Sequence, residues 1–554
     1  MMRKKIVAVL FICFFMPLAF SQNISVVKLN ENEVQRMASL CKIWGFLKYY
    51  HPNVAKGNFN WDEQLFLMIP KVLKSENKEE LSKVYLNWIA DLGEVKACKS
   101  CNAADKKESF DENFDLSWIQ NTNLYTEELT SKLKYIENNR SQGSNKYVKF
   151  ATNDNVEIQN EIQYPNFEYP EQNVRLLGLF RYWNVVEYFF PYKYQMDQKW
   201  DAVLIEMIPR FLEAKNTIEY QLAISETIMK LDDSHATFYS KEISDFFGRK
   251  HIPATFKIID NKVVIDGFYD ESLSKTSDIR IGDVVEKVNG KKVIDIFNEN
   301  AKYINGSNLN VKMKNAYAFI FNGSTDSVKV TLNRNGVISE KNWARYYFKD
   351  FKIKEDTGEK YKILEGNIGY ADMNLLEMKD VDKMMTDFKN TKAIIIDYRG
   401  PFMNFMPFLI ARRFIKNEKI FARVIQPDLS YPGHFFEKKP KTITPMSGKY
   451  YSGKVIILVN SNTQSSSEYS TMMFQAGDNV TTIGSQTSGA DGDVSEIEFV
   501  GFKSKMSGLG VFYPNKSETQ RKGLKIDIEA NPTIKGIQEG KDEVLQKAIE
   551  FIAK

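Results

Sequence analysis

Residue types that build metal and redox sites are scarce, since the 554-residue chain contains only four cysteines and four histidines. The one closely spaced cysteine pair, Cys98 and Cys101, has neither a second pair nor histidines near it, as a zinc site would require. Charge of one sign is also lacking, because 75 basic and 71 acidic residues leave a net charge of +4. Scattered charges of both signs are typical of a solvated surface. We therefore expect no metal, no cofactor and no nucleic-acid partner.

Long hydrophobic runs are missing everywhere except at the start of the chain. In residues 1–21, three basic residues at positions 3–5 precede an apolar core and then Ala19-Phe20-Ser21, which offers small residues for cleavage before Gln22. This pattern predicts a secretory signal. No other apolar run is long enough to span a bilayer, so we expect no membrane span after signal cleavage. The expected location is periplasmic or secreted, where the cysteine pair favours a local disulfide over a redox role.

The N-terminal half contains an internal repeat. Residues recur 139 positions later (183 − 44 = 139) at Trp44/Trp183, Tyr49/Tyr188, Pro52/Pro191, Trp61/Trp200, Asp62/Asp201, Pro70/Pro209 and Leu92/Leu231. Apolar residues at helical spacing open each copy, and proline ends each first helix. We predict one helical unit over residues 22–102 and a second over 171–247. Between them, the polar residues 103–170 indicate a partly helical surface connector or loosely packed linker.

Short alternating strands are predicted over residues 248–345. Between two of them, Asn289-Gly290 is a type I′ hairpin signal that follows Gly282-Asp283-Val284-Val285. This hairpin resembles that of a PDZ domain, a module that binds extended C-termini by strand addition. A carboxylate-binding loop of the usual pattern is not visible, so peptide capture and a purely structural module both stay open.

A candidate nucleophile lies near residue 465. Residues 455–459 are apolar and mostly β-branched, which predicts a strand buried on both faces. A polar turn follows, and then Gln464-Ser465-Ser466-Ser467-Glu468 precedes apolar residues at helical spacing. A helix start collects backbone N–H groups and the positive end of the helix dipole, which favours a serine nucleophile. A plain N-cap cluster is the alternative.

This segment, with the Gly-rich loop at 484–492, resembles the nucleophile region of the tail-specific (C-terminal-processing) serine peptidase family. The resemblance implies that Ser465 is the nucleophile. In the main branch of that family a lysine is the general base, but Ala490 stands at the matching position. No Lys or His occurs between Val455 and Phe502, so the base has to come from a remote part of the chain.

The second helical unit ends in a candidate base. It carries Asp233-Ser234-His235, whereas Lys96 stands opposite His235 in the first unit. Ser234-His235 resembles the Ser-His pair of the tricorn-type branch of the same family, in which His is the base of a Ser-His-Ser-Glu tetrad. The resemblance implies that His235 is the base and Ser234 helps to orient it. The fourth member is either Glu518 or Gln520. A purely structural histidine after a helix is the alternative.

The remaining residues, 346–554, are expected to form the catalytic domain. A buried strand at 393–397 runs into Tyr398-Arg399-Gly400 and resembles a family segment whose loop supplies oxyanion donors. The resemblance implies that the N–H groups of Gly400 and Ser466 hold the oxyanion, although Pro401 follows where glycines are usual. Asp397 and Arg399 alternatively only fix the loop.

Taken together, the sequence predicts an α/β multidomain protein with helical repeat units, a PDZ-like β-rich domain and a crotonase-like ββα catalytic domain. The expected function is an exported serine peptidase that acts on polypeptide, processing C-termini or degrading peptides, with Ser465 as nucleophile and His235 as base. The main alternative is an inactive scaffold that binds peptide or an apolar ligand, as the retinoid-binding relatives of this fold do. Esterase or acyl-transfer activity at the same serine is a third possibility.

Overall fold

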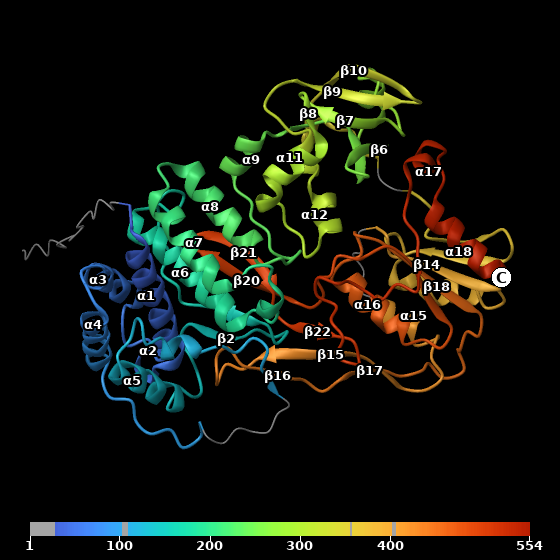
Figure 1. The fold of residues 1–554 in the computed structure, drawn as a ribbon. Helices are drawn as coiled ribbons and strands as arrows, with labels where there is room; N and C mark the ends of the chain where they lie inside the picture. Colours follow the sequence, from blue (N-terminus) through green and yellow to red (C-terminus); the bar gives the residue numbers. More distant parts are fainter. Residues whose placement is uncertain (1–27, 102–108, 355–356, 401–405) are drawn as a thin grey trace, which may run out of the picture.

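The computed structural model describes residues 28–101, 109–354, 357–400 and 406–554 (Figure 1). The predicted signal, residues 1–21, lies outside these ranges. Helices occupy the N-terminal side of the molecule, a small β-rich part lies above, and a mixed α/β part lies at the C-terminal side. The expected class, a mixed α/β multidomain protein, is confirmed at this level.

Two helical segments form the N-terminal side. The first helical segment, residues 31–96, contains α1 (Glu31–Tyr50), α2 (Pro52–Ala55), α3 (Trp61–Leu73) and α4 (Lys78–Asp91). The second helical segment, residues 172–235, contains α6 (Gln172–Phe189), α7 (Trp200–Glu213) and α8 (Thr217–Met229). Helix α1 starts at a capping box in which the Asn30 side chain accepts from the Glu33 N–H and Glu33 accepts from the Asn30 N–H.

The two segments make reciprocal contacts. In the first, the Trp44 Nε1 donates to the Trp61 carbonyl at 3.0 Å, and in the second the Trp183 Nε1 donates to the Trp200 carbonyl at the same distance. Between segments, Lys42 pairs with Asp201 at 2.7 Å and Arg181 pairs with Asp62 at 2.5 Å. These pairs are equivalent under the 139-residue offset (181 − 42 and 201 − 62). Each first helix therefore contacts the α3- or α7-type helix of the other segment.

The stretch between the two segments is more ordered than the predicted connector. It contains α5 (Glu127–Asn138) and the strands β2 (Val148–Phe150) and β3 (Val156–Ile158). The apolar face of α5, with Leu129, Leu133 and Ile136, is fully buried in the same core as α1. Glu161 pairs with both Lys48 and Arg181 inside that core. The polar composition of this stretch gave no indication that α5 and Glu161 are buried in the core.

A separate six-stranded sheet follows α9 (Lys241–Phe247), with strand order β10-β9-β7-β6-β5 and β8 beside β7. Its strands are β5 (Ala254–Ile259), β6 (Lys262–Phe268), β7 (Val284–Val288), β8 (Lys291–Lys292), β9 (Ser327–Arg334) and β10 (Val337–Ala344). Its helices are α10 (Glu271–Thr276), α11 (Val293–Asn300), α12 (Leu309–Asn315) and α13 (Tyr317–Ile320). The predicted hairpin joins β7 to β8, and its turn residues Asn289 and Gly290 both have positive φ, 48° and 82°.

The C-terminal part is built on a sheet of order β12-β13-β14-β18-β19-β23, in which only β12 runs antiparallel to its neighbour. These strands are β12 (Tyr361–Leu364), β13 (Ile368–Asp372), β14 (Ala393–Asp397), β18 (Lys454–Val459), β19 (Val480–Gly484) and β23 (Ile528–Glu529). One face packs against α14 (Val381–Asp387), α15 (Pro407–Ala411) and α16 (Ser466–Gln475), and the other against α18 (Glu543–Ala553). Both faces of β18 are therefore buried, as its apolar run predicts.

A β-hairpin connects the C-terminal part to the helices. It is formed by β20 (Val494–Phe499) and β21 (Phe502–Ser507), which lie among α6 and α7 in Figure 1. Phe499 stacks on Tyr182 with ring centres 4.2 Å apart. A second small sheet also joins the two parts, because it pairs β1 from the N-terminal half with strands of the C-terminal part. Its strands are β1 (Ser109–Phe110), β15 (Lys419–Pro427), β16 (Phe435–Glu437), β17 (Lys441–Ile443) and β22 (Gly510–Phe512). The hairpin brings Ser507 next to the end of the second helical segment.

Candidate active site

Ser465 lies at the turn between β18 and α16. Its backbone is left-handed, with φ 55° and ψ −120°, a conformation that non-glycine residues adopt at a cost of about 1–3 kcal/mol and that clusters at functional sites. The side chain is half-buried, and α16 begins at the next residue, Ser466. In the first helical turn, the Ser467 N–H donates to the Gln464 carbonyl at 3.1 Å and the Glu468 N–H donates to the Ser465 side chain. Among the described residues this leaves the Ser466 N–H for an anion at this place.

A buried carboxylate holds the turn in this shape. Glu468 accepts hydrogen bonds from the N–H groups of Ser465 (3.3 Å), Gly489 (2.8 Å) and Ala490 (3.0 Å) and from the Thr487 hydroxyl (2.5 Å). Burial raises the pKa of Glu468, and these donors partly oppose the increase. The side chain therefore fastens the Gly-rich loop to the start of α16, and the Ser465 N–H also donates to the Ala490 carbonyl at 3.0 Å.

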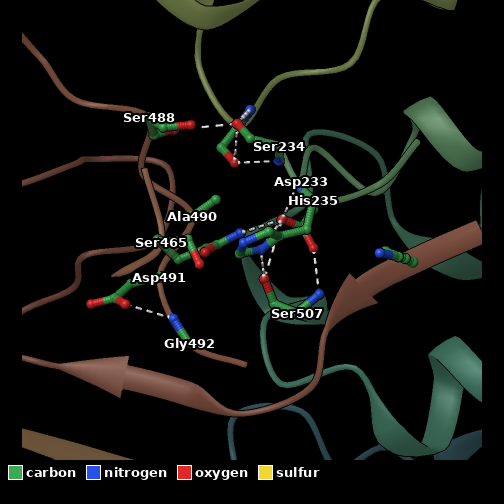
Figure 2. A network of polar contacts seen from close by, with 12 residues as sticks. Asp233, Ser234, His235, Ser465, Ser488, Ala490, Asp491, Gly492 and Ser507 are labelled. Atoms are coloured by element: carbon green, nitrogen blue, oxygen red, sulfur yellow. Dashed lines mark hydrogen bonds and ion pairs between the residues drawn. The ribbon is translucent and has the colours of Figure 1, made fainter. Parts of the chain in front are cut away.

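His235 follows α8 and is buried at the junction with the C-terminal part. Its Nδ1 lies 3.0 Å from the Ser507 Oγ and 3.6 Å from the Asp233 Oδ1. Its Nε2 is buried and has no hydrogen-bond partner within the described residues. Figure 2 shows the Ser465 side chain beside the imidazole, in the same cluster as Asp233 and Ser507.

The Gly-rich loop connects the two candidate catalytic residues. Ser465 bonds to Ala490, as noted above, and the Ser488 carbonyl accepts from the Ser234 hydroxyl at 3.4 Å. Ser234 and its neighbour His235 therefore reach the same loop that holds Ser465 in place. The sequence positions involved are more than two hundred residues apart.

Ser234 does not contact the imidazole. Its hydroxyl lies 3.0 Å from the Ser307 Oγ and accepts from the Ser307 N–H at 2.8 Å, while its own N–H donates to the Ser307 Oγ at 2.8 Å. Ser307 precedes α12 in the β-rich part. Ser234 therefore links the helical, β-rich and C-terminal parts at the site.

The two residues predicted as the fourth member occupy different surroundings. Glu518 accepts from the Tyr194 hydroxyl at 2.6 Å and from Gln195 at 2.7 Å, so its carboxylate is directed to the helical side and away from His235. Gln520 is buried, and its Nε2 lies 3.5 Å from the Asp233 Oδ1.

The loop that carries Gly400, one of the two predicted oxyanion donors, is bonded to the turn before Ser465. The Thr463 hydroxyl donates to the Tyr398 carbonyl at 2.8 Å, and the Asn462 side chain donates to the Arg399 carbonyl at 3.0 Å. These bonds hold the loop that carries Gly400 against the Ser465 turn. Pro401, which follows, lies outside the described residues. Arg399 pairs with Asp397 at 2.6 Å and with Asp542 at 2.7 Å, contacts that fix the loop.

Two residues near the site, Ser507 and Lys314, gave no sequence signal. Ser507 contacts His235, as described, together with Asp233, which belongs to the polar run before His235 in the sequence. Lys314, from α12, donates to the Ser461 carbonyl at 2.9 Å, and burial lowers the pKa of its ammonium. Ser507 and Lys314 are both remote in sequence from the groups that they contact.

Elsewhere the structure bears on the predicted disulfide. Cys98 and Cys101 form a disulfide, as expected, and Cys41 is a buried free thiol in the core. Within the described ranges, no group of three or more His, Cys, Asp or Glu side chains is placed to hold a metal ion. In those ranges there is also no helix with the length and apolar character needed to cross a membrane.

Comparisons with known proteins agree with this architecture. Residues 366–530 match the model of peptidase family S41. A search of the curated proteins finds no match. Among solved structures, mature CPAF complexed with lactacystin aligns with a TM-score of 0.54 at 14% identity, covering 69% of this chain and 98% of that one. Mature CPAF alone gives 0.54 at 13% identity with the same coverage.

The CPAF likeness establishes a shared fold. The photosystem II D1 C-terminal processing protease also matches, at 14% identity over 67% of this chain and 98% of that one, but its TM-score of 0.36 is too low to support an argument. The family resemblance inferred from the Ser465 segment is confirmed by the family match. The C-terminal part of this chain is a serine-type peptidase domain of family S41.

Proposed function

We propose that the protein is an exported serine peptidase in which Ser465 attacks the peptide carbonyl and His235 is the general base. The observation that carries this proposal is the state of the imidazole: Nδ1 is held by Ser507, while Nε2 is buried, without a hydrogen-bond partner among the described residues, on a ring that lies beside Ser465. A base needs one free nitrogen directed at the nucleophile and another that is held in place. The left-handed backbone of Ser465 supports a functional role as well.

The proposed reaction has two halves. The Ser465 Oγ forms a bond to the substrate carbonyl carbon as its proton passes to the His235 Nε2, and the carbonyl oxygen becomes an oxyanion bound by the Ser466 and Gly400 N–H groups. The C–N bond then breaks, and His235 gives the proton to the leaving amine. Water, activated by the same imidazole, hydrolyses the acyl-enzyme and restores Ser465.

The finer architecture belongs to the same proposal. The reciprocal contacts between the helical segments support two copies of one helical unit, and the β7–β8 hairpin supports a PDZ-like module over residues 248–345. The chain's apolar start supports export, which predicts that the mature protein begins at Gln22. Sequencing the N-terminus of protein secreted by a bacterial host tests this, and an uncleaved start contradicts it.

A binding function is the second candidate. A cavity of about 240 Å³ lies beside the C-terminal half of α16, lined by apolar groups that include Phe421, Met472 and Tyr513 and by the polar Lys525 and Asp527. A scaffold that carries a small apolar ligand there needs no reactive serine. The two candidates differ in the chemistry of Ser465, because only the peptidase requires an activated hydroxyl.

Labelling with a fluorophosphonate separates these functions. We expect the wild-type protein to be labelled at Ser465 and to cleave an unfolded polypeptide such as reduced casein. Ser465→Ala and His235→Ala should each abolish cleavage while circular dichroism shows an unchanged fold, and Ser467→Ala, which alters a neighbouring serine, should retain it. Absence of labelling in the folded wild-type protein, or full activity in either of the first two variants, overturns the assignment.

A further inference from the structure

We infer that Asp233, acting through the hydroxyl of Ser507, holds His235 in the tautomer that carries its proton on Nδ1 and leaves the lone pair on Nε2. The inference rests on the proposed function, since it explains how His235 becomes a competent base. Asp233 and Ser507 are positioning residues in this scheme. Neither belongs to the tetrad that the family resemblance implies.

The first step is the state of Asp233, which is buried. Its Oδ2 accepts from the Ser507 N–H at 2.7 Å, and its Oδ1 accepts from the His235 N–H at 3.0 Å. Burial opposes ionisation of this carboxyl, but the charge of His235 and the two N–H groups lower its pKa below the usual value. Asp233 is therefore a carboxylate, which accepts hydrogen bonds and has none to donate.

The second step is the direction of the Ser507 hydroxyl. Its Oγ lies 3.2 Å from the Asp233 Oδ1 and 3.0 Å from the His235 Nδ1. Because the carboxylate has no proton, the hydroxyl must donate to Asp233. The lone pairs of Ser507 then face the imidazole, and a favourable contact at 3.0 Å requires a proton on Nδ1. The direct distance from Nδ1 to Asp233, 3.6 Å, is too long for a hydrogen bond, so Ser507 is the link.

The third step concerns the other nitrogen. With the proton on Nδ1, the neutral imidazole has its lone pair on Nε2, the buried atom for which the described residues offer no partner. Ser465 lies on that side of the cluster (Figure 2). The hydrogen-bond chain therefore orients the ring and also selects the nitrogen that accepts the nucleophile's proton.

No other carboxylate among the described residues pairs with or hydrogen-bonds to this ring. Glu518 is held by Tyr194 and Gln195, and Gln520 carries no charge. The Gln520 amide instead donates to the Asp233 Oδ1 across 3.5 Å. The negative charge that stabilises an imidazolium during the reaction is thus supplied by Asp233, from the same chain segment as the base.

The tautomer is measured directly by ¹⁵N NMR on protein labelled in histidine, since ring nitrogens with and without a proton have well-separated shifts. Four histidines give four ring systems, and His235→Gln identifies the signals of His235. In the wild-type protein we expect a protonated Nδ1 and an unprotonated Nε2. In Asp233→Asn the amide donates toward Ser507, the hydroxyl turns to donate to Nδ1, and the proton moves to Nε2.

Kinetics give the second readout. Asp233→Asn should lower kcat by about 10³-fold or more with KM little changed, as expected when the base has the wrong tautomer. Ser507→Ala removes the link and should lower kcat by about 10–100-fold, and Ser507→Thr, which keeps the hydroxyl, should recover most of that loss. Asp232→Asn is the matched control: this neighbouring carboxylate pairs with Lys312 at 2.9 Å, so kcat and the tautomer should not change.

The inference is overturned if Asp233→Asn keeps the Nδ1–H tautomer, or if its kcat stays within threefold of the wild type. The NMR result does not depend on turnover. A wild-type protein that shows the Nδ1–H tautomer yet reacts with no fluorophosphonate therefore refutes the peptidase and leaves the relay intact. Circular dichroism shows whether Asp233→Asn has lost its fold. In that case the kcat of Ser507→Ala is compared with that of Ser507→Thr, and equal losses in the two variants overturn the inference.

Discussion

The two helical segments pack alike but end differently. Both bury a tryptophan pair that exchanges Nε1-to-carbonyl hydrogen bonds, and both send one salt bridge to the other segment. The first ends in Glu94-Val95-Lys96, with both charged residues exposed. The second ends in Asp233-Ser234-His235, all buried against the C-terminal part. The two segments therefore share their packing and differ at the residues just beyond it, where the second segment makes the contacts of the site.

The salt bridges between the segments differ in their surroundings as well. Arg181 and Asp62 are both nearly inaccessible to solvent, whereas Asp201, the partner of Lys42, has 56% of its side chain exposed. Burial raises the pKa of Asp62, and the charge of Arg181 opposes that effect. Equivalent positions thus carry one buried and one solvated ion pair, which are expected to respond very differently to mutation.

Exchanging the residues at the segment ends gives the largest expected effect. His235→Lys places the first segment's residue in the second and should lower the rate of polypeptide cleavage by at least about 10³-fold, because an ammonium protonated at neutral pH replaces the base. Lys96→His is the reciprocal control and should leave the rate unchanged, since Lys96 is exposed. A His235→Lys protein within tenfold of the wild-type rate would show that this position does not need an imidazole.

Removing the acidic partner of each salt bridge should lower the free energy of unfolding by different amounts. Asp62→Ala leaves Arg181 buried with one partner fewer and should cost about 3 kcal/mol of unfolding free energy. Asp201→Ala removes a partly solvated pair and should cost less than about 1 kcal/mol. Urea denaturation followed by circular dichroism measures both. Equal losses would mean that the difference in burial has no energetic consequence.

The smallest effect at neutral pH is expected at His51, which stands opposite Phe190 under the same offset (190 − 51 = 139). Burial, with a smaller contribution from the charge of Lys132, lowers the pKa of the fully buried His51 to about 4. The unfolded chain takes up a proton below about pH 6.5 and the folded one only below about 4, so stability falls as the pH drops through this window. The loss at pH 4 reaches up to about 3 kcal/mol.

His51→Phe places the residue of the second segment in the first and should remove this pH dependence. Thermal unfolding at pH 7 and at pH 4.5 then shows a smaller difference for the variant than for the wild-type protein. The comparison uses the change with pH, so a constant packing penalty for the larger ring does not affect it. An unchanged difference would assign the acid sensitivity to other groups.

Much of the fold was predictable because its signals are local. The apolar run at 455–459 and the Asn289-Gly290 turn each specify an element by their own sequence, and β18 and the β7–β8 hairpin are found there. The family relationship was predictable from the Ser465 segment for the same reason. The burial of α5 in the predicted connector was not predictable, because its three buried apolar residues are diluted among charged ones.

The parts of the site that depend on tertiary contacts were not predictable. Ser507 ends a strand with no motif, and its contact with Asp233 spans 274 positions. Lys314 reaches the Ser465 turn from a different part of the fold, 147 positions before its partner. Glu518 is a charged residue near the expected place of an acid, yet tyrosine and glutamine partners hold it elsewhere. The spacing of residues along the sequence does not indicate which of these tertiary contacts form.

The 272 positions between His235 and Ser507 have a consequence for biosynthesis. A ribosome completes the imidazole-bearing helices long before it makes the β20–β21 hairpin, so a growing chain holds the proposed base without its anchor. Truncated translation products that stop before residue 465 lack the proposed nucleophile altogether. Under the proposed function, hydrolytic capacity therefore arises only after almost the whole polypeptide has been made.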